Sequence, residues 1–303
     1  MRWNQDFAQP MKVILPVLSL ILAMVSVPSV ASAGVILGAE VRMSYEDNVV
    51  GLLSDKQPGT GGGMTGGGTM MRASTMGGMG GTSGMGGTGS GQTQYTGSQS
   101  TGDFSSTISA EAGGYTDFSV DTAFFAKGFA QNTTFSKFTE FNSTIVGAST
   151  GANVIVADGL SGQLTLFGKH KNYGDTNRNS NAYGASISFK QKARPELWFQ
   201  ERVEYEDNRA STSSFNYAGT SIGITAGYEV TETLLLTPGY SYLVQNYNNV
   251  GSKLITNTAS LGLEKRLAKA WSVGGEYDMQ ISKPDGGTSI TDNIYSLALR
   301  YSY

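Results

Sequence analysis

Residues 295–303, at the C-terminus of the chain, read Tyr-Ser-Leu-Ala-Leu-Arg-Tyr-Ser-Tyr. Aromatic or large apolar side chains stand at every second position, with small or polar side chains between them. This period of two is typical of a β-strand with one apolar and one polar face. The same alternation occurs at 35–46, 183–190 and 218–230. The sequence therefore predicts an all-β protein.

The polar face of these strands indicates which kind of β-protein this is. It consists of Gly, Ser, Thr and Ala with isolated charges of both signs. The solvent face of a soluble β-sandwich carries more Lys and Glu. The opposite face is aliphatic in the middle of each strand and aromatic near its ends, as on the lipid side of a barrel. We therefore predict an antiparallel, up-and-down transmembrane β-barrel.

The number of alternating segments predicts the number of strands. Twelve segments are centred near residues 40, 110, 123, 146, 166, 186, 202, 224, 240, 260, 276 and 298. Short turns are expected near 113–118, 150–159, 191–196, 231–234 and 265–270, and long connections at 47–103, 130–142, 171–181, 206–217, 246–253 and 282–292. An even strand number with both termini at the short-turn end is the plan of outer-membrane barrels. Ten or fourteen strands would require one misassigned hairpin, near 130–160. Inside the ninth strand, Pro238 predicts a bulge.

Composition excludes several kinds of site. The 303 residues include no Cys and one His, and 21 Lys+Arg against 24 Asp+Glu give a net charge of −3. Without Cys there are no disulfides and no thiolate metal sites. The weak negative charge offers no basic surface for nucleic acid. We expect no cofactor, no metal and no nucleic-acid partner.

The first 33 residues have the pattern of a secretory signal peptide. The apolar run at 13–27 is flanked by Arg2 and Lys12 and is too short to span a membrane. It is followed by Ala31-Ser32-Ala33, which is typical of a cleavage site. We expect cleavage near Ala33, which leaves 34–303 as the barrel domain.

Aromatic residues near the predicted strand ends indicate the membrane boundary. We assign Trp198, Trp271, Tyr301 and Tyr303 to an aromatic girdle. The segment that ends at Tyr303 resembles the C-terminal β-signal of Gram-negative outer-membrane proteins. This resemblance implies an outer-membrane location and recognition by the barrel-assembly machinery. Outer-membrane lipids and lipopolysaccharide are then the expected surroundings.

Residues 59–91 contain 16 glycines and six methionines in 33 positions. Such a segment has too little apolar surface to form a core, so we predict a disordered external loop at 52–103. Met76 and Met79 are soft ligands that suit Cu(I). Because the segment has neither Cys nor His, we favour a disordered external or pore-occluding loop over copper capture.

A short motif occurs twice, as Arg42-x-x-Tyr45-Glu46-Asp47-Asn48 and as Arg202-x-x-Tyr205-Glu206-Asp207-Asn208. Each copy is predicted to end an outward-running strand, the first and the seventh of twelve. The copies reflect either shared strand-end chemistry or an acidic rim of Glu46, Asp47, Glu206 and Asp207 that binds Ca²⁺ or favours cations. The strand end Tyr-x-Asp-Asn resembles one found in a broad family of β-barrel porins, some associated with exopolysaccharide export. That resemblance implies a surface polysaccharide as a partner.

His170 is the only histidine and lies between Lys169 and Lys171. Some twelve-stranded outer-membrane barrels are lipid hydrolases that use Ser and His. The neighbourhood of His170 has no Gly-x-Ser-x-Gly motif, and an imidazole flanked by positive charges is a poor base. We therefore expect a solvated histidine and no enzymatic activity.

Charged residues on the predicted inner face either close the lumen by ion pairs or line a channel. They are Glu40, Arg42, Asp121, Lys127, Lys190, Arg202, Glu204, Glu229, Glu264, Glu276, Asp278 and Arg300. Twelve tilted strands give a backbone radius on the order of 12 Å and a lumen of roughly 10 Å or less. The leading prediction is an outer-membrane channel for small polar solutes or ions. The alternative is a plugged structural or interaction barrel that displays its long loops to a partner such as exported polysaccharide.

Overall fold

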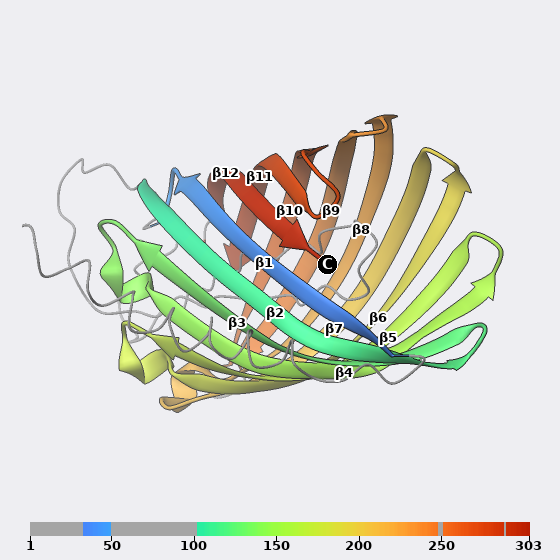
Figure 1. The fold of residues 1–303 in the computed structure, drawn as a ribbon. Helices are drawn as coiled ribbons and strands as arrows, with labels where there is room; N and C mark the ends of the chain where they lie inside the picture. Colours follow the sequence, from blue (N-terminus) through green and yellow to red (C-terminus); the bar gives the residue numbers. More distant parts are fainter. Residues whose placement is uncertain (1–32, 50–101, 248–250, 288) are drawn as a thin grey trace, which may run out of the picture.

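The computed structural model describes residues 33–49, 102–247, 251–287 and 289–303. Its strands are β1 (Ala33–Glu46), β2 (Asp103–Ser119), β3 (Thr122–Phe135), β4 (Ser143–Ala157), β5 (Leu160–Tyr173), β6 (Ser180–Arg194), β7 (Leu197–Ala210), β8 (Tyr217–Thr231), β9 (Leu234–Tyr247), β10 (Ser252–Arg266), β11 (Trp271–Pro284) and β12 (Ile290–Ser302). Each strand pairs antiparallel with the next, and β12 pairs with β1, so the sheet closes into a barrel (Figure 1). The predicted twelve-stranded antiparallel barrel is confirmed.

Two sequence predictions fall largely on residues outside this description. The signal peptide at 1–33 overlaps it only at Ala33, where β1 begins, and the predicted loop at 52–103 overlaps it only at 102–103. No helix among the described residues has the length and apolar character needed to cross a membrane.

The alternation seen in the sequence separates two faces of the barrel wall. On β1 and β12 the side chains of Val41, Met43 and Leu297 point outward and are about half or more exposed. Between them, Arg42 and Ala298 point inward and are buried. Because successive residues of a strand point to opposite faces, this pattern continues around the wall. The outside is therefore apolar and the inside is mostly polar.

The two ends of the barrel differ in the length of their connections. At one end, the turn end, two to four residues join the strands, at 120–121, 158–159, 195–196, 232–233 and 267–270. At the other end, the loop end, the connections are 47–102, 136–142, 174–179, 211–216, 248–251 and 285–289. The chain ends at the turn end, where Tyr303 and Leu37 exchange two backbone hydrogen bonds of 2.9 and 3.1 Å.

The first short turn lies later than predicted. We expected it at 113–118, but β2 continues to Ser119 and the turn is at 120–121. Gly113 lies within the strand opposite Lys127, where an added Cβ would come within 2.5 Å of the Lys127 Cβ atom. Glycine here permits close packing inside the wall rather than a turn. As a consequence, Asp121 lies in the turn and does not line the lumen, which corrects its predicted place.

Pro238 causes no bulge, contrary to our expectation. Thr225 pairs with Gly239 and Tyr228 pairs with Leu236, so the register of β8 and β9 is the same on both sides of the proline. The register shift in this pair of strands lies at Glu229 and Thr231, beside the turn. Proline lacks the backbone donor for one ladder bond, and here the pairing is interrupted opposite it without a change of register.

Candidate functional site

The lumen is the candidate site, and the predicted lining residues other than Asp121 lie on its inner face. They are Glu40, Arg42, Lys127, Lys190, Arg202, Glu204, Glu229, Glu264, Glu276, Asp278 and Arg300, whose parity along each strand is that of the inward positions. Five of them form one ion-pair network, and four other residues form a second; each network is confined to a few neighbouring strands.

The arginine network (Glu40, Arg42, Glu264, Glu276 and Arg300) covers the inner face of β1 and β10–β12. Glu40 accepts from Arg42 Nε at 2.8 Å and from Arg300 Nε at 2.6 Å. Arg42 Nη1 reaches Glu276 at 3.3 Å, and Arg300 Nη1 reaches Glu264 at 2.8 Å. Each guanidinium thus bridges two carboxylates, a geometry suited to its fixed fork of donors.

The lysine network (Lys169, Lys171, Glu206 and Tyr217) covers β5, β7 and β8 nearer the loop end. The two ammonium groups bind the Glu206 carboxylate at 2.5 and 2.6 Å, and the Tyr217 hydroxyl donates to the same carboxylate at 2.6 Å. The side chains of the three charged residues are 1% exposed. The sequence reading did not place Lys169 and Lys171 in the lumen. The alternation of β5 could have shown their position. Leu164, Leu166 and His170 are exposed, so the residues that alternate with them point inward.

Within the described ranges, the following ion pairs run along the wall and do not reach across the lumen. Arg42 and Glu276 lie two strands apart around the barrel, as do Arg300 and Glu264. The Lys171–Glu206 pair also spans two strands, and the Lys127–Glu111 pair, at 2.7 Å, joins neighbouring strands. In a twelve-stranded barrel the opposite wall is six strands away. The charges of these pairs are therefore compensated locally, with no need to close the lumen.

Five inward aromatic rings lie directly opposite a glycine on a neighbouring strand. The pairs are Tyr115 with Gly34, Phe125 with Gly151, Phe129 with Gly147, Phe167 with Gly184, and Trp198 with Gly227. At each of these glycines an added Cβ would come within 3 Å of the ring. The rings thus lie against the wall, in the space that a side chain would otherwise fill.

Trp198 is one of these rings, which corrects its assignment to the girdle. Its side chain is 6% exposed, and the Lys190 ammonium lies 4.4 Å from its ring centroid on the inner face. The error was one of register, because position 198 has the same parity in β7 as Arg202 and Glu204. Trp271 and Tyr301, by contrast, pair on the outer face with ring centroids 5.2 Å apart, and Tyr303 is 74% exposed at the chain end.

The four residues of the predicted acidic rim do not form a rim. Glu206 lies in the lysine network, whereas Asp207 points outward and binds Arg209 at 3.1 Å. The strand β7 continues to Ala210, so the second copy of the motif lies inside a strand while the first copy ends one. No cluster of three or more acidic or histidine side chains in the described ranges is arranged to hold a metal ion.

The first copy of the motif instead forms hydrogen bonds across the seam between β1 and β12. Asp47 accepts hydrogen bonds from the Asn293 backbone at 2.8 Å and from its side chain at 2.7 Å. Burial raises the pKa of Asp47, but the hydrogen bonds from Asn293 outweigh it and hold that pKa below its ordinary value. Glu46 lies opposite Ile294, at the loop end of the same seam.

His170 lies on the outer face of β5, away from the lumen. Its ring nitrogens lie 2.8 Å from Asn181 Oδ1 and 3.0 Å from Asn172 Oδ1. The ring is thus engaged by two amide groups on an exposed surface.

Three consecutive loops share a motif that the sequence reading missed. The turns η2 (Thr139–Phe141), η3 (Thr176–Arg178) and η4 (Ser213–Phe215) are each followed by an asparagine, Asn142, Asn179 and Asn216. Each asparagine Oδ1 accepts from the backbone N–H at the end of the preceding strand, at 2.6 to 2.7 Å. The pattern Ser/Thr-x-x-Asn recurs every 37 residues, and a search for repeats of that period would have found it.

Backbone hydrogen bonds join these loops into one rim. The Asn142 carbonyl accepts from Gly174 at 2.8 Å, and the Asn179 carbonyl accepts from Ser211 at 2.7 Å. The sheet is in this way extended beyond the barrel from β3 to β8.

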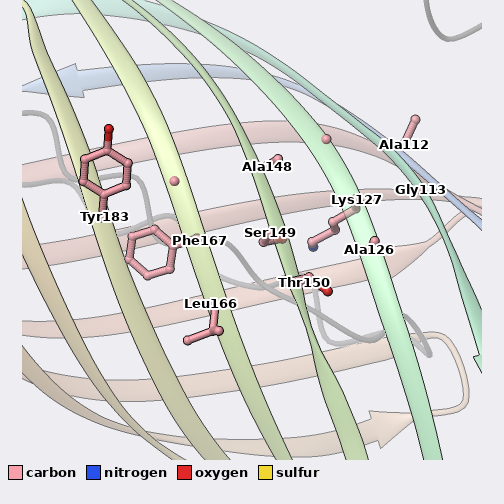
Figure 2. Close-up of a pocket in the computed structure, with 12 residues that line it drawn as sticks. Ala112, Gly113, Ala126, Lys127, Ala148, Ser149, Thr150, Leu166, Phe167 and Tyr183 are labelled. Carbon is pink, nitrogen blue, oxygen red and sulfur yellow. The ribbon is translucent and has the colours of Figure 1, made fainter.

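A shallow groove of about 590 Å³ crosses the outer face of β2 to β6 (Figure 2). Its floor is a row of small residues in direct register, Ala112, Gly128, Ala148 and Gly168. Leu166 and Tyr183, both exposed, stand beside it. The groove belongs to the apolar exterior and is separate from the lumen.

Comparison with known proteins finds similar folds among solved structures only. No family model matches the chain, and no curated protein matches its sequence. Among solved structures, it is similar to an outer membrane channel from Pseudomonas putida F1, with a TM-score of 0.55, 7% identity, and coverage of 91% of this chain and 97% of that one. It is also similar to the NanC porin (TM-score 0.48, 9% identity, 87% and 98% covered) and to the KdgM porin in complex with disordered oligogalacturonate (TM-score 0.45, 8% identity, 88% and 99% covered). At 7% identity, the first of these similarities shows a shared barrel fold.

Proposed function

We propose that the chain is an outer-membrane channel of a Gram-negative bacterium that admits small polar solutes or ions through a narrow lumen. The observation that carries this proposal is the course of the ion pairs. The ion pairs of both networks run along the wall, so the lumen is lined by polar groups without being bridged by these pairs. A polar pathway inside an apolar exterior is what a hydrophilic solute needs in order to cross a bilayer.

The aromatic rings of the inner face support the same function. A Phe or Trp that projected toward the barrel axis would narrow a lumen of roughly 10 Å by half or more. The glycine opposite each ring lets it lie along the wall instead.

The outer-membrane location is supported by the exterior and by the sequence. Exposed apolar side chains such as Met43, Leu261 and Leu297 would be unfavourable in water and suit lipid. The signal peptide, with cleavage near Ala33, and the C-terminal β-signal supply the route. The partners of the chain are then the barrel-assembly machinery during insertion, and outer-membrane lipids and lipopolysaccharide after it.

Single-channel recording in planar bilayers tests the proposal. Purified, heat-modifiable barrel should give discrete, ohmic conductance steps, and a heat-unfolded sample from the same preparation should give none. A folded barrel that inserts but stays silent would overturn it.

A second candidate is a barrel that displays its loops to a surface partner such as exported polysaccharide. The observation in its favour is the rim at the loop end, where three loops share backbone hydrogen bonds and so form a defined surface. Binding of polysaccharide by a silent barrel would favour display over transport.

A further inference from the structure

The three turns of the rim place equivalent residues at one position. The third residue of each turn is Phe141, Arg178 or Phe215. Phe141 is buried against Val49 and Phe138, and Phe215 packs against a buried cluster of Tyr217, Tyr247 and Leu254. The middle turn thus carries a cation at a position that its two neighbours fill with an aromatic ring.

Arg178 is 3% exposed, and aromatic rings cover its guanidinium group. The guanidinium carbon lies 4.4 Å from the ring centroid of Tyr173 and 5.7 Å from that of Phe141. Such stacking occupies the faces of the guanidinium plane and leaves its edge for hydrogen bonds. Burial lowers the pKa of Arg178 to about 10, so the group is still charged at neutral pH.

The edge of this guanidinium lacks an acceptor. Its Nη1 atom is buried without a hydrogen-bond partner, and none of the ion pairs in the described part of the chain includes Arg178. The nearby Asp175 carboxylate accepts instead from Asn177, at 3.0 and 3.1 Å. Buried donors are nearly always satisfied in folded proteins, so an orphaned charged donor indicates an acceptor supplied from elsewhere.

The lysine network lies close to Arg178, because Lys171 is two residues before Tyr173, whose ring stacks on the Arg178 guanidinium. Lys169 and Lys171 share the single Glu206 carboxylate. Lys171 binds the Tyr217 hydroxyl at 3.1 Å, and the Tyr217 ring lies 5.5 Å from the ring of Tyr247. The carboxylates of Asp175 and Glu140 also act on Arg178, and that of Glu204 acts on Lys169, so the orphaned Nη1 atom rather than a net charge distinguishes this place.

We infer that Arg178 binds the oxyanion of a small solute, a carboxylate or a phosphate, at the loop end of the lumen. The in-plane edge of a guanidinium donates in the geometry that such oxyanions accept. Tyr173 and Phe141 hold the guanidinium in place. The inference gives the proposed channel a ligand class, and it rests on that function only for the access of the solute to the lumen.

Equilibrium binding to the barrel folded in detergent tests this without requiring conductance. The probes are glucuronate and glucose 6-phosphate, with glucose as the neutral control of the same ring, and the readout is calorimetry. We expect either anion, but not glucose, to bind, and the stronger of the two identifies the preferred oxyanion. Arg178→Gln should weaken binding at least tenfold. The matched control is Arg209→Gln, which removes a 74% exposed arginine on the outer face and should leave binding unchanged.

Three results would overturn the inference: equal affinity in Arg178→Gln, equal affinity for glucose, or no binding of either anion to the unmodified barrel. If Arg178→Gln gives no heat-modifiable barrel, Arg178→Lys decides the question, because it keeps the charge and loses the planar fork. It should weaken binding several-fold, and unchanged affinity would count against Arg178. A silent barrel that binds anions contradicts only the channel, and a conducting barrel that binds none contradicts only this site.

Discussion

Trp198 lies directly opposite Gly227, with its indole ring in the space where a side chain at position 227 would stand. An added Cβ there would come within 2.0 Å of the ring atom Cε2. The same relationship between a ring and a glycine recurs at four other places on the inner wall of β1–β6. Glycine weakens a strand locally because it has no side chain to pack. At these positions it also leaves room for a large ring to lie along the wall, away from the barrel axis.

Replacing this glycine should therefore either displace the indole or strain the wall. We expect Gly227→Ala to lower the stability of the barrel by about 1–3 kcal/mol, as overpacking does in closely packed interiors. The measurement is the midpoint of heat-induced unfolding on gels, together with urea unfolding in vesicles.

Gly275→Ala is the matched control, since it adds the same methyl group to the outer face of β11, where the nearest atom is 3.9 Å away. Gly227→Ala combined with Trp198→Leu should recover most of the loss. An unchanged midpoint in Gly227→Ala alone would contradict the packing described here.

Glu206 holds two lysine ammonium groups together, so its neutralisation should be costly. Glu206→Gln would remove the one carboxylate that both Lys169 and Lys171 bind, and would leave the two ammonium groups buried near each other. Breaking a buried ion pair from one side costs on the order of 3–5 kcal/mol. We expect a large drop in the unfolding midpoint and, in any barrel that folds, a shift of ion selectivity toward anions.

The neighbouring Asp207 provides the comparison. Asp207→Asn removes the same charge one residue away, from a partly exposed pair with Arg209, and exposed pairs contribute about 0–1 kcal/mol. Equal effects of the two substitutions would show that the lysine network does not depend on Glu206.

The barrel was predictable from sequence because alternation is a local property. Each strand shows its two faces in its own residues, as in 295–303, and the strand number follows by counting. What failed was assigned from single residues. A turn was expected at 113–118, but Gly113 lies within a strand whose neighbour packs closely. Trp198 read as a girdle residue, although a ring can also lie inside when a glycine faces it.

The candidate site was predicted only in outline for a related reason. The inner positions of most charged residues follow from strand parity, but their partners depend on register between strands, which no single strand contains. Glu206 was expected at a rim, and the three residues after Asp207 that continue β7 to Ala210 were overlooked. The orphaned edge of Arg178 depends on the contact between two loops and has no signature in one loop alone.

Asp47 should make the seam between β1 and β12 sensitive to acid. Its pKa is lowered in the folded barrel, so its contribution is fully present above the ordinary carboxyl pKa of about 4 and is lost as pH falls through the lower, folded value. At pH 7, Asp47→Asn should therefore unfold at lower urea than the unmodified chain, by about 1 kcal/mol for the weakened hydrogen bonds to Asn293. Below pH 3 the two proteins should approach each other, and a difference that stays constant across this range would contradict the assignment.

The rim should loosen when one of its repeated asparagines is shortened. Asn179→Ala removes the acceptor for the Tyr173 backbone N–H, now bonded at 2.7 Å, and leaves that donor without its partner. We expect faster proteolysis within 174–179 and a loss of about 1 kcal/mol. Asn179→Asp keeps an acceptor oxygen in the same place and should restore protection. If the alanine variant resists protease as well as the unmodified chain, the backbone bonds between loops suffice to hold the rim.

Excision of residues 59–91 should leave a folded barrel. The strands on either side of the long connection meet directly, because Glu46 lies opposite Asp103, and residues 47–58 and 92–102 remain to join them. Val49, which packs against Phe138 and Phe141, is retained. Ordering a segment with 16 glycines would cost about 1–2 kcal/mol per residue, with only six methionine side chains to offset it. Heat modifiability should therefore be unchanged. Conductance should rise if this segment enters the lumen and stay the same if it projects away, whereas a deletion that abolishes folding would show that the segment is part of the folded structure.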